Sequence, residues 1–458
     1  MTAKGTPLEL GTKPIGQLLM QYALPAIIAM TASSLYNIVD SIFIGHGVGA
    51  LALSALALAF PLMNLAAAFG SLVGVGASTL LSVRLGQKDY DSANRILGNV
   101  VVLNLIIGIS FTIVGLLLLD PMLLFFGASE KTLPYGRDFM RIILLGNVVT
   151  HLFLGLNAML RSSGLPQKAM YATIGTVVIN ICLNPLFIFG FGWGIQGSAL
   201  ATIISQVIML LWQLRFFCRK SNFLHLTRDG FRLKRYIVRG TIAIGLSPFL
   251  MNTAACVIVI LINQGLKHGY GAQGDLAIGA FGIVNRVIFI FVMIVMGLNQ
   301  GMQPIAGYNY GAKLYPRLIS VLWKTMFWGV LVTTIGFLLG EFCPRIIASA
   351  FTTEEELIAL SVRGMRIVML LFPFVGFQMV TSNFFLSIGM AGKAIFLSLT
   401  RQLIFLIPSL LILPTLIGKE GVWYSMPLAD GAAIIASAIM LHLQLRSFKK
   451  KISSEQLS

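Results

Sequence analysis

Long apolar stretches, separated by short polar segments, fill almost the whole chain of 458 residues. Each stretch has roughly 20 or more mostly apolar residues, the length that a helix needs to cross about 30 Å of hydrocarbon. The apolar residues run continuously and do not alternate with period two, which excludes a β-barrel. We expect an all-α integral membrane protein of about twelve spans, at 15–42, 51–82, 95–119, 137–161, 169–190, 195–218, 237–265, 276–307, 318–342, 357–388, 394–416 and 422–446.

Three motifs of the first half recur in the second half. The offset in residue number is the same each time (311 − 86, 365 − 140 and 389 − 164 all equal 225): Gly86-Gln87-Lys88 recurs as Gly311-Ala312-Lys313, Met140-Arg141-Ile142 as Met365-Arg366-Ile367, and Gly164 with Lys168-Ala169 as Gly389 with Lys393-Ala394. Two similar helical bundles around a central site are the usual plan of secondary transporters. We predict two pseudo-symmetric six-helix bundles, at 1–218 and 237–458, joined by a basic linker at 219–236.

The composition fits a membrane protein, with 57% hydrophobic residues, 11% charged residues and a mean hydropathy of +0.87. The net charge of +17 would suggest nucleic acid in a soluble protein, but the Lys and Arg residues fall on alternate loops, so we expect no such partner. By the positive-inside rule, these loops, the linker and both termini are cytoplasmic. The linker has two interpretations: a topogenic connector that touches anionic headgroups, or a regulatory contact.

Asp40 is a candidate functional residue, because an ionisable side chain inside a span costs at least a few kcal/mol. Tyr36 stands four residues earlier, which places its phenol on the same helix face as the carboxylate. Ser33, Ser34 and Asn37 extend this polar stripe. The alternative is that Asp40 lies at the outer interface and caps the end of its span.

The fifth predicted span contains a polar pair that complements Asp40. Asn180 and Asn184 share one helix face, and Pro185 leaves a backbone carbonyl one turn back without its usual donor. Thr202, in the sixth span, adds a hydroxyl. Because Na⁺ prefers oxygen ligands, Asp40, Asn180, Asn184 and Thr202 form a candidate Na⁺ site, whereas the buried carboxylate alone can carry a proton. The two asparagines could instead only join neighbouring helices by hydrogen bonds.

The second half offers two further polar candidates inside predicted spans. Asp430 is either a packing partner or a transport residue, and Arg286 either pairs with an acid of the second bundle or lines a wet cavity. Aligning Pro25 with Pro248 sets Asp40 opposite Asn263, so the proposed ion site belongs to the first half alone. The sequence contains no HExxH, no P-loop and no acidic cluster of an intramembrane prenyl transferase, so we expect no enzyme and no cofactor.

Several motifs together resemble the MATE (multidrug and toxic compound extrusion) family, over nearly the whole chain. They are Tyr36-Asn37-Ile38-Val39-Asp40, Gly86-Gln87-Lys88, Leu160-Arg161-Ser162-Ser163-Gly164, Asn180 with Asn184-Pro185, and Gln303-Pro304 with Tyr308-Asn309-Tyr310-Gly311-Ala312. Each motif alone is weak, but their order and the duplicated six-helix plan leave little room for another family.

The resemblance implies a V-shaped pair of bundles that exports amphipathic, often cationic, drugs in antiport with H⁺ or Na⁺ by alternating access. It implies a monomer in the bacterial cytoplasmic (inner) membrane, whose partners are small-molecule drugs or organic cations and the lipid bilayer. The runner-up is a lipid-linked precursor flippase of a related two-bundle fold. Such proteins usually have extra spans, whereas two units of about 225 residues account for this whole chain.

The resemblance also assigns roles to particular residues. In members with an ion site in the amino-terminal bundle, the carboxylate, the two fifth-span polar residues and the sixth-span threonine match Asp40, Asn180, Asn184 and Thr202, and Tyr36 matches a tyrosine beside that carboxylate. Some relatives have Asp at the position of Asn184, so this chain offers one acid there. The acids of the NorM-type branch are missing from 240–264 and 357–388, which favours the bacterial MepA-like branch.

Overall fold

The computed structural model describes residues 9–457, apart from the side chains of Ile38, Ala50 and residues 455–457. The described part of the chain is helical and contains no strand. The first half forms α1 (Glu9–Thr12), α2 (Ile15–Gly47), α3 (Ala50–Gly86), α4 (Tyr90–Leu117), α5 (Leu119–Phe125), α6 (Leu133–Leu145), α7 (Asn147–Ser162), α8 (Pro166–Pro185), the π-helix η1 (Leu186–Gly190) and α9 (Gly194–Phe217).

The second half has a similar order of elements. It forms the 3₁₀ turn η2 (Arg228–Phe231), α10 (Arg235–Tyr270), η3 (Gly271–Gln273), α11 (Gly274–Gly311), α12 (Tyr315–Phe342), α13 (Pro344–Ser349), α14 (Glu355–Val368), α15 (Phe372–Ser387), α16 (Ala391–Leu399), the π-helix η4 (Thr400–Leu406), α17 (Ile407–Ile417), η5 (Gly418–Glu420) and α18 (Gly421–Leu457). The division into bundles at 218/219 and 236/237 stays a prediction.

The long apolar helices of the described residues group into twelve candidate spans, and the short helices α1, α5 and α13 lie outside them. Eight continuous stretches are long and apolar enough to cross a membrane, and two bent pairs add two more. Two of the eight, 235–311 and 391–454, are each divided by a short 3₁₀ turn, η3 or η5, which adds the last two. The predicted span 137–161 is one of the bent pairs, α6 and α7 at 52°, and 357–388 is the other, α14 and α15 at 53°. Both predicted spans are thus present as helix pairs, and each is broken by a bend.

The duplication is visible in the backbone. Two described residues other than glycine have positive φ: Lys88 (62°), just after the end of α3, and Lys313 (58°), just after the end of α11. Their numbers differ by the repeat offset of 225. Gly164 and Gly389 have the same relation, with φ of 94° and 75°. A left-handed residue after a helix satisfies carbonyls of the last turn, and Lys tolerates this conformation less well than Gly. The same turn is therefore built twice.

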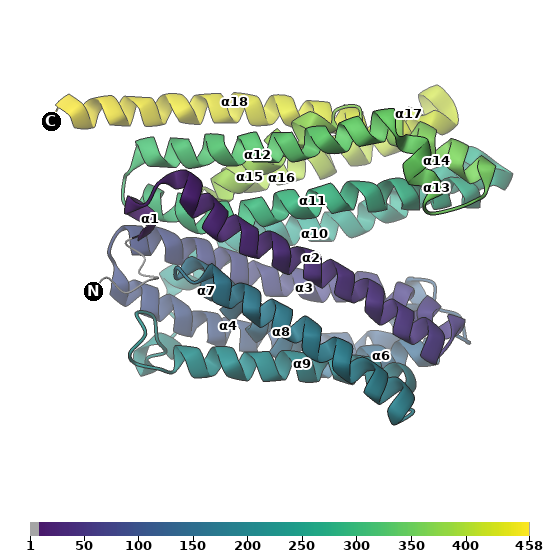
Figure 1. Cartoon of the computed structure of the whole chain (residues 1–458), viewed down its shortest axis with the longest axis horizontal. Helices are drawn as coiled ribbons and strands as arrows, with labels where there is room; N and C mark the ends of the chain where they lie inside the picture. The colour runs from purple at the N-terminus through teal and green to yellow at the C-terminus, as the bar shows by residue number, and fades with distance from the viewer. Residues whose placement is uncertain (1–8, 458) are drawn as a thin grey trace.

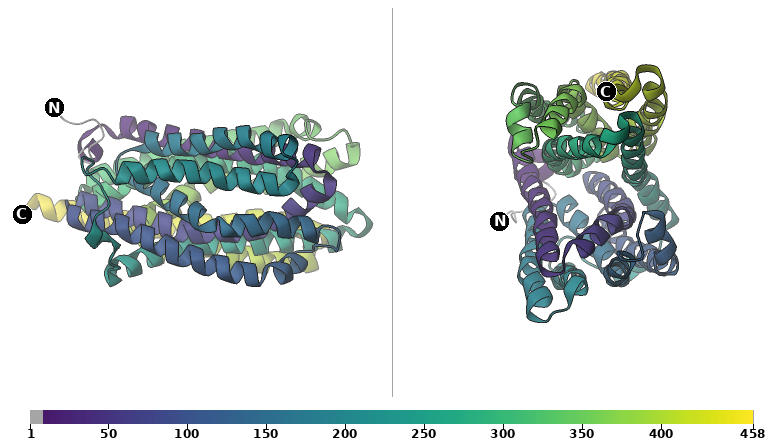
Figure 2. Two further views of the ribbon diagram at one scale, coloured as in Figure 1. Left: turned by 90° about the horizontal axis from the view of Figure 1, so that it is seen from below. Right: turned by 90° about the vertical axis from the view of Figure 1, so that its right-hand side faces the viewer.

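The helices of the first and second halves form two groups that lie side by side along the long axis of the molecule (Figures 1 and 2). They meet where α2 and α3 pack against α10 and α11, and we call this contact surface the seam. At its centre Gly86 faces the carbonyl of Tyr308, and Gly311 faces the carbonyl of Val83 (311 − 86 and 308 − 83 both equal 225). A Cβ atom at either glycine would come within 2.0 Å of the opposing oxygen, so glycine is needed at both places.

The two flanks of the seam show the same symmetry. A Cβ atom on Gly301 of α11 would lie 2.6 Å from backbone atoms of Ala23, and one on Gly76 of α3 would lie 2.0 Å from the carbonyl oxygen of Thr241. Gly301 and Gly76 are again related by the repeat offset (301 − 76 = 225). Small residues let helix backbones approach closely in membranes, where dispersion and hydrogen bonds drive association. The seam therefore repeats one packing solution in both halves.

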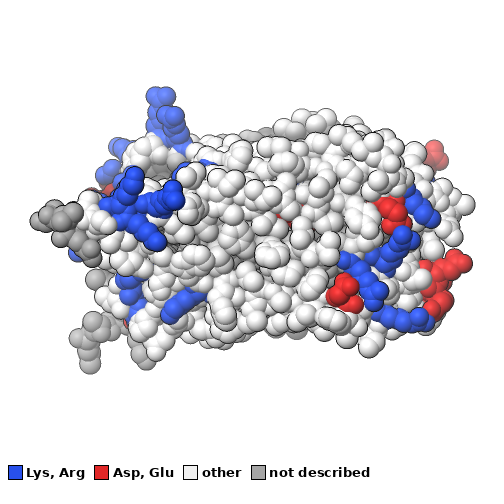
Figure 3. Space-filling view, turned by 90° about the horizontal axis from the view of Figure 1, so that it is seen from above, with Lys and Arg blue, Asp and Glu red and all other residues white. Residues whose placement is uncertain are grey.

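The seam occupies one end of the helices. Several polar and ring contacts of the described residues lie on the halves of these helices nearer Arg84 and Lys313. They include the hydrogen bonds from Gln303 to Ser78 (3.0 Å) and Thr79 (2.7 Å) and the ring pair Phe69–Phe249 (4.8 Å), and Arg161 of α7 donates to Gln300 there (2.6 Å). We call this the basic end, because Lys and Arg predominate there, whereas acidic side chains gather with basic ones at the opposite end (Figure 3).

Two segments at the basic end cross from one group of helices to the other. Arg317 of α12 donates to the carbonyl oxygens of Leu10 (3.3 Å) and Lys13 (2.6 Å), which ties the segment before α2 to the second half. In the opposite direction, the Asn99 amide of α4 donates to the carbonyls of Gly230 (2.9 Å) and Arg232 (3.1 Å) in the linker. The linker is thus packed against the first half rather than left free.

Candidate ion-coupling site

Three neighbouring helices of the first half each place two polar side chains on one face. They are Tyr36 and Asp40 on α2, Asn180 and Asn184 on α8, and Ser198 and Thr202 on α9. In every pair the spacing is four residues, about one helical turn, so the side chains stack along the axis. The six groups therefore meet as two layers, one around Asp40 and one around Tyr36.

The layer around Asp40 is buried and contains only neutral partners of the carboxylate. Asn184 Nδ2 and Ser198 Oγ both donate to Asp40 Oδ1, the serine at 2.6 Å. The exposed fractions of Asp40, Asn184 and Ser198 are 7%, 0% and 0%. Asp40 therefore faces helices α8 and α9, and does not act as a solvent-exposed cap on the end of α2.

The second layer is joined to the first through the Asn180 amide. Asn180 Oδ1 accepts from Asn184 Nδ2 at 3.1 Å, while Asn180 Nδ2 donates to Thr202 Oγ1 at 3.1 Å and lies 3.5 Å from the Tyr36 hydroxyl. Tyr36 and Thr202 share a hydrogen bond of 2.8 Å, and Thr202 donates to the Ser198 carbonyl. The five residues predicted from the sequence are thus brought into one connected network.

The electrostatics of this network are unbalanced. Among the described residues, no Lys, Arg or His forms an ion pair with Asp40. Both side-chain donors go to Oδ1, so Oδ2 has no hydrogen-bond partner within the described part of the chain, and the buried Asn184 Oδ1 has none either. A buried carboxylate without a counter-charge costs several kcal/mol. Binding a proton or a metal cation would remove that cost.

Ser198 is the member of the network that the sequence reasoning missed. It belongs to the stretch Gly197-Ser198-Ala199, which looks like a small-residue packing surface. A Cβ atom on Gly197 would lie 3.0 Å from Phe187, so packing is indeed close beside it. The available signal was the spacing of four between Ser198 and Thr202, the same spacing as in the other two pairs.

The second-half candidates are placed differently. Asp430 of α18 accepts a hydrogen bond from Arg401 Nε of η4 at 2.5 Å, with 6% of the Asp430 side chain exposed. Arg286 of α11 is exposed and forms no ion pair among the described residues. The expected pairing of Arg286 with an acid is therefore not found. Arg401, which does make such a pair, had not been selected as a candidate.

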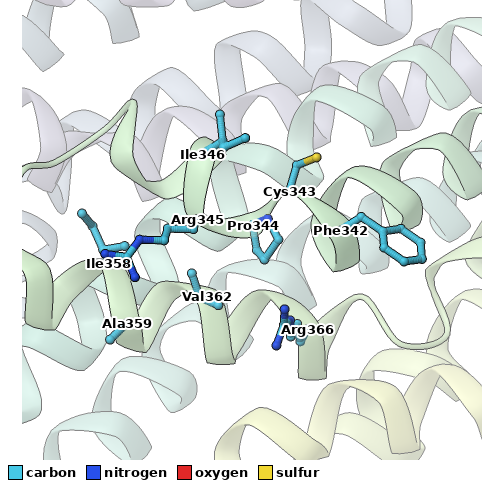
Figure 4. A pocket seen from close by; sticks show the side chains of 9 residues that line it. All are labelled: Phe342, Cys343, Pro344, Arg345, Ile346, Ile358, Ala359, Val362 and Arg366. Atoms are coloured by element: carbon cyan, nitrogen blue, oxygen red, sulfur yellow. The ribbon is translucent and has the colours of Figure 1, made fainter.

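A cavity of about 410 Å³ lies elsewhere, at the opposite end from the seam, between the end of α12, α13 and α14 (Figure 4). Its walls include Arg345 and Arg366, which pair with Glu355 (2.5 Å) and Glu341 (4.0 Å). Apolar side chains such as Phe342 complete the lining. The Asp40 network is formed by other helices and does not contribute to this cavity.

Comparisons with known proteins agree with this architecture. The sequence profile of the MatE family matches residues 25–186 and 247–411, which is more than half of the chain and one match in each half. Multidrug export protein MepA of Staphylococcus aureus (strain MSSA476) is 26% identical over 431 residues, covering 94% of both chains. Multidrug export protein MepA of Staphylococcus haemolyticus (strain JCSC1435) is 27% identical over 436 residues, covering 95% of both.

Solved structures share the fold. The MATE multidrug transporter DinF-BH in complex with rhodamine 6G has 35% identity and a TM-score of 0.87, covering 94% of this chain and 96% of that one. An outward-facing conformation of a multidrug resistance MATE family transporter of the MOP superfamily has 23% identity and a TM-score of 0.89, covering 98% and 100%. The twelve spans, the duplicated seam and these matches lead to one conclusion: the chain belongs to the MatE family and is a multi-pass membrane transporter, not an enzyme.

Proposed function

We propose that this protein exports amphipathic, often cationic, drugs in exchange for H⁺ or Na⁺. The names of its relatives support a multidrug role, since MepA proteins are multidrug export proteins and DinF-BH has been solved with rhodamine 6G bound. The sequence supports it too, because 20 Met and 31 Phe supply adaptable apolar surfaces and aromatic faces for organic cations. We place both termini in the cytoplasm of a bacterial cell, on the basic side of the membrane.

The observation that carries the proposal is the Asp40 carboxylate, buried among neutral donors with one oxygen unpartnered. Such a group binds a cation well while the three helices stay packed as they are here. It binds less well where they separate and water reaches the carboxylate. An ion with different affinities for two states shifts the equilibrium between them, and the affinity for a second ligand must change reciprocally.

The two states are those of alternating access. The paired glycines allow backbone contact across the seam, which supports the proposal that the basic end is closed in this state. We propose that drug is taken up when the seam opens on the cytoplasmic side, and is released when the seam closes and a cation occupies Asp40. All six side chains of the network come from one chain, which supports our proposal that the unit of transport is a monomer.

Both coupling ions suit the residues present. A proton needs only Asp40 Oδ2, whereas Na⁺ would use that oxygen together with the unpartnered Asn184 Oδ1 and the hydroxyls of Ser198 and Thr202. The ion is cargo here, and the protein needs no cofactor. Because the donor set suits both ions, the test must impose both gradients separately.

Export of rhodamine 6G from proteoliposomes tests this function. A pH gradient or a Na⁺ gradient is imposed across vesicles that contain the purified protein, and movement of the dye is followed by fluorescence. We expect one gradient to drive transport, and the same gradient to have no effect with Asp40→Asn. Asp120→Asn is the matched control, because Asp120 pairs with Arg137 outside the network. If neither gradient moves the dye through the unmodified protein, the antiport function is refuted.

A further inference from the structure

The pair Arg401–Asp430 is the second-half feature that the proposed function leaves unexplained. Arg401 Nε donates to Asp430 Oδ1 at 2.5 Å, and the Asp430 side chain is 6% exposed. The pair is held by a single hydrogen bond. By contrast, Arg137 and Asp120 form two parallel bonds of 2.8 and 2.7 Å. Asp430 Oδ2 thus has no hydrogen bond within the described residues, as is also true of Asp40 Oδ2.

The position of the pair relates it to the Asp40 network. Subtracting the repeat offset of 225 places Arg401 opposite Thr176 on α8 and Asp430 opposite Ser205 on α9 (401 − 225 and 430 − 225). These positions lie about one helical turn from Asn180 and Thr202, on the same two helices. The pair thus lies on the second-half equivalents of α8 and α9, about one turn from the Tyr36 layer and about two turns from the layer around Asp40.

The local backbone helps to place Arg401 there. Arg401 belongs to the π-helix η4 (Thr400–Leu406). The first half also contains a π-helix, η1 (Leu186–Gly190), which follows Asn184 and Pro185 but is not at the repeat offset, since 400 − 225 and 406 − 225 place η4 opposite 175–181 of α8. A π-helical turn inserts an extra residue, which rotates the following side chains relative to a regular helix, and such turns recur at functional sites. Each half thus has an irregular turn beside its buried acid.

The two acids differ in their partners. Asp40 is contacted by the neutral side chains of Asn184 and Ser198, whereas Asp430 is contacted by a guanidinium. Arginine keeps its charge at every physiological pH and is covalently tethered, so it neutralises Asp430 without exchanging with solution. A proton or Na⁺ at Asp430 would have to displace this permanent counter-charge.

We propose that Arg401 is a built-in counter-cation that prevents the second bundle from binding an exchangeable ion, and that Asp430 is a latent second cation site. This inference rests on the proposed function, because it treats Asp40 as the exchangeable site. It accounts for a transporter with one ion site on a duplicated scaffold. The number of coupled cations is then set by Arg401 in the second half as well as by Asp40 in the first.

The test replaces Arg401 by an uncharged residue of similar length and counts bound cations. In purified Arg401→Gln, equilibrium binding of ²²Na⁺, or proton uptake at constant ionic strength, should rise from about one to about two per chain. Arg401→Lys should stay at one, because the ammonium still neutralises Asp430. Arg401→Gln with Asp430→Asn should return to one. An unchanged count in Arg401→Gln, or a gain that persists in the double variant, would overturn the inference.

Stability gives a second measurement, because Arg401→Gln leaves a buried carboxylate without its partner. Its melting temperature should fall in low salt at neutral pH, and should recover with acid or NaCl, since either supplies the missing cation. Should the variant fail to fold, the same rescue of folded yield is expected, and its absence would contradict the inference. The double change Arg401→Gln with Asp40→Asn separates the two proposals, because it should bind one cation, at Asp430, although the site at Asp40 is lost. If the single variant Asp40→Asn still binds a cation, the proposed function is refuted. The inference about Arg401 is tested separately, by comparing the cation count of Arg401→Gln with and without Asp430→Asn.

Discussion

The interiors of the two helix groups share a scaffold and differ in charge. In the first, Asp40 receives hydrogen bonds from Asn184 and Ser198, which carry no charge. In the second, Asp430 meets Arg401. The seam between the groups shows the opposite trend, because its glycine contacts are repeated at the same offset of 225. The glycine contacts of the seam have therefore kept the symmetry of the duplication, whereas the partners of the buried acids inside the two helix groups differ.

This difference has a physical basis. Both sides of the seam are constrained by backbone contact, where a single added Cβ atom would collide with the opposing helix. A buried acid needs only a positive charge that compensates its own. Either an exchangeable ion or a tethered guanidinium can supply that charge. The two solutions differ in function, because only the exchangeable ion links compensation to a gradient across the membrane.

Making the first interior resemble the second should have the largest effect. Asn184→Lys places an ammonium beside Asp40, so it should remove the need for an exchangeable ion and abolish gradient-driven export of rhodamine 6G. We expect a loss on the order of a hundredfold, because displacing a buried counter-charge costs a few kcal/mol. Asn184→Gln, which stays neutral, should lose clearly less activity than Asn184→Lys. Coupled export by a folded Asn184→Lys would show that charge compensation at Asp40 does not drive the cycle.

The seam offers the next largest effect. Gly301→Leu adds a side chain where a Cβ atom would already lie 2.6 Å from the Ala23 backbone, so the basic end should no longer close. Export should fall by roughly tenfold or more, since a shift of about 1.4 kcal/mol in the equilibrium is a factor of ten. Gly282→Leu in the same helix is the control, because no atom lies within 4 Å of its Cβ position. Equal activity of the two variants would refute the role of the seam in closure.

Removing one donor from Asp40 should have a smaller effect. Ser198→Ala deletes the hydroxyl that donates to Asp40 Oδ1 at 2.6 Å. A hydrogen bond to a charged group contributes about 1.5–3 kcal/mol, so cation affinity in binding assays should change by roughly tenfold or more. Ser205→Ala is the control on the same helix, because Ser205 Oγ donates to the Thr202 carbonyl and not to Asp40. Identical cation affinities in both variants would remove Ser198 from the site.

The smallest effect should come from a neutral hydrogen bond across the seam. Gln303→Met loses the bonds to Ser78 and Thr79, which join the two groups of helices. Each neutral bond contributes about 0.5–1.5 kcal/mol, so we expect a change of several-fold in export rate and a lower melting temperature. Gln378→Met should change less, because its bond to Ser382 stays within α15. A larger effect at Gln378 would contradict this ranking.

Much of the fold was predictable from the sequence, because each span must be apolar and the repeat is marked by glycines and lysines. The bends between α6 and α7 and between α14 and α15 were not, since both arms are apolar enough to read as one helix. Spacing of four residues identified pairs that share a face, such as Tyr36 and Asp40. It could not tell which faces meet, and so it missed Ser198 and the partner of Asp430. That information lies in the rotation of the helices about their axes, which hydropathy does not record.

The number of exchangeable cations bound per chain tests the central claim most directly. Equilibrium binding of ²²Na⁺, or proton release on adding rhodamine 6G if the coupling ion is H⁺, can be measured on the purified protein and on Asp40→Asn and Asp430→Asn. We predict about one cation for the unmodified chain, none for Asp40→Asn, and one for Asp430→Asn. A cation that persists in Asp40→Asn, or disappears in Asp430→Asn, would contradict the assignment of the exchangeable site to the first bundle.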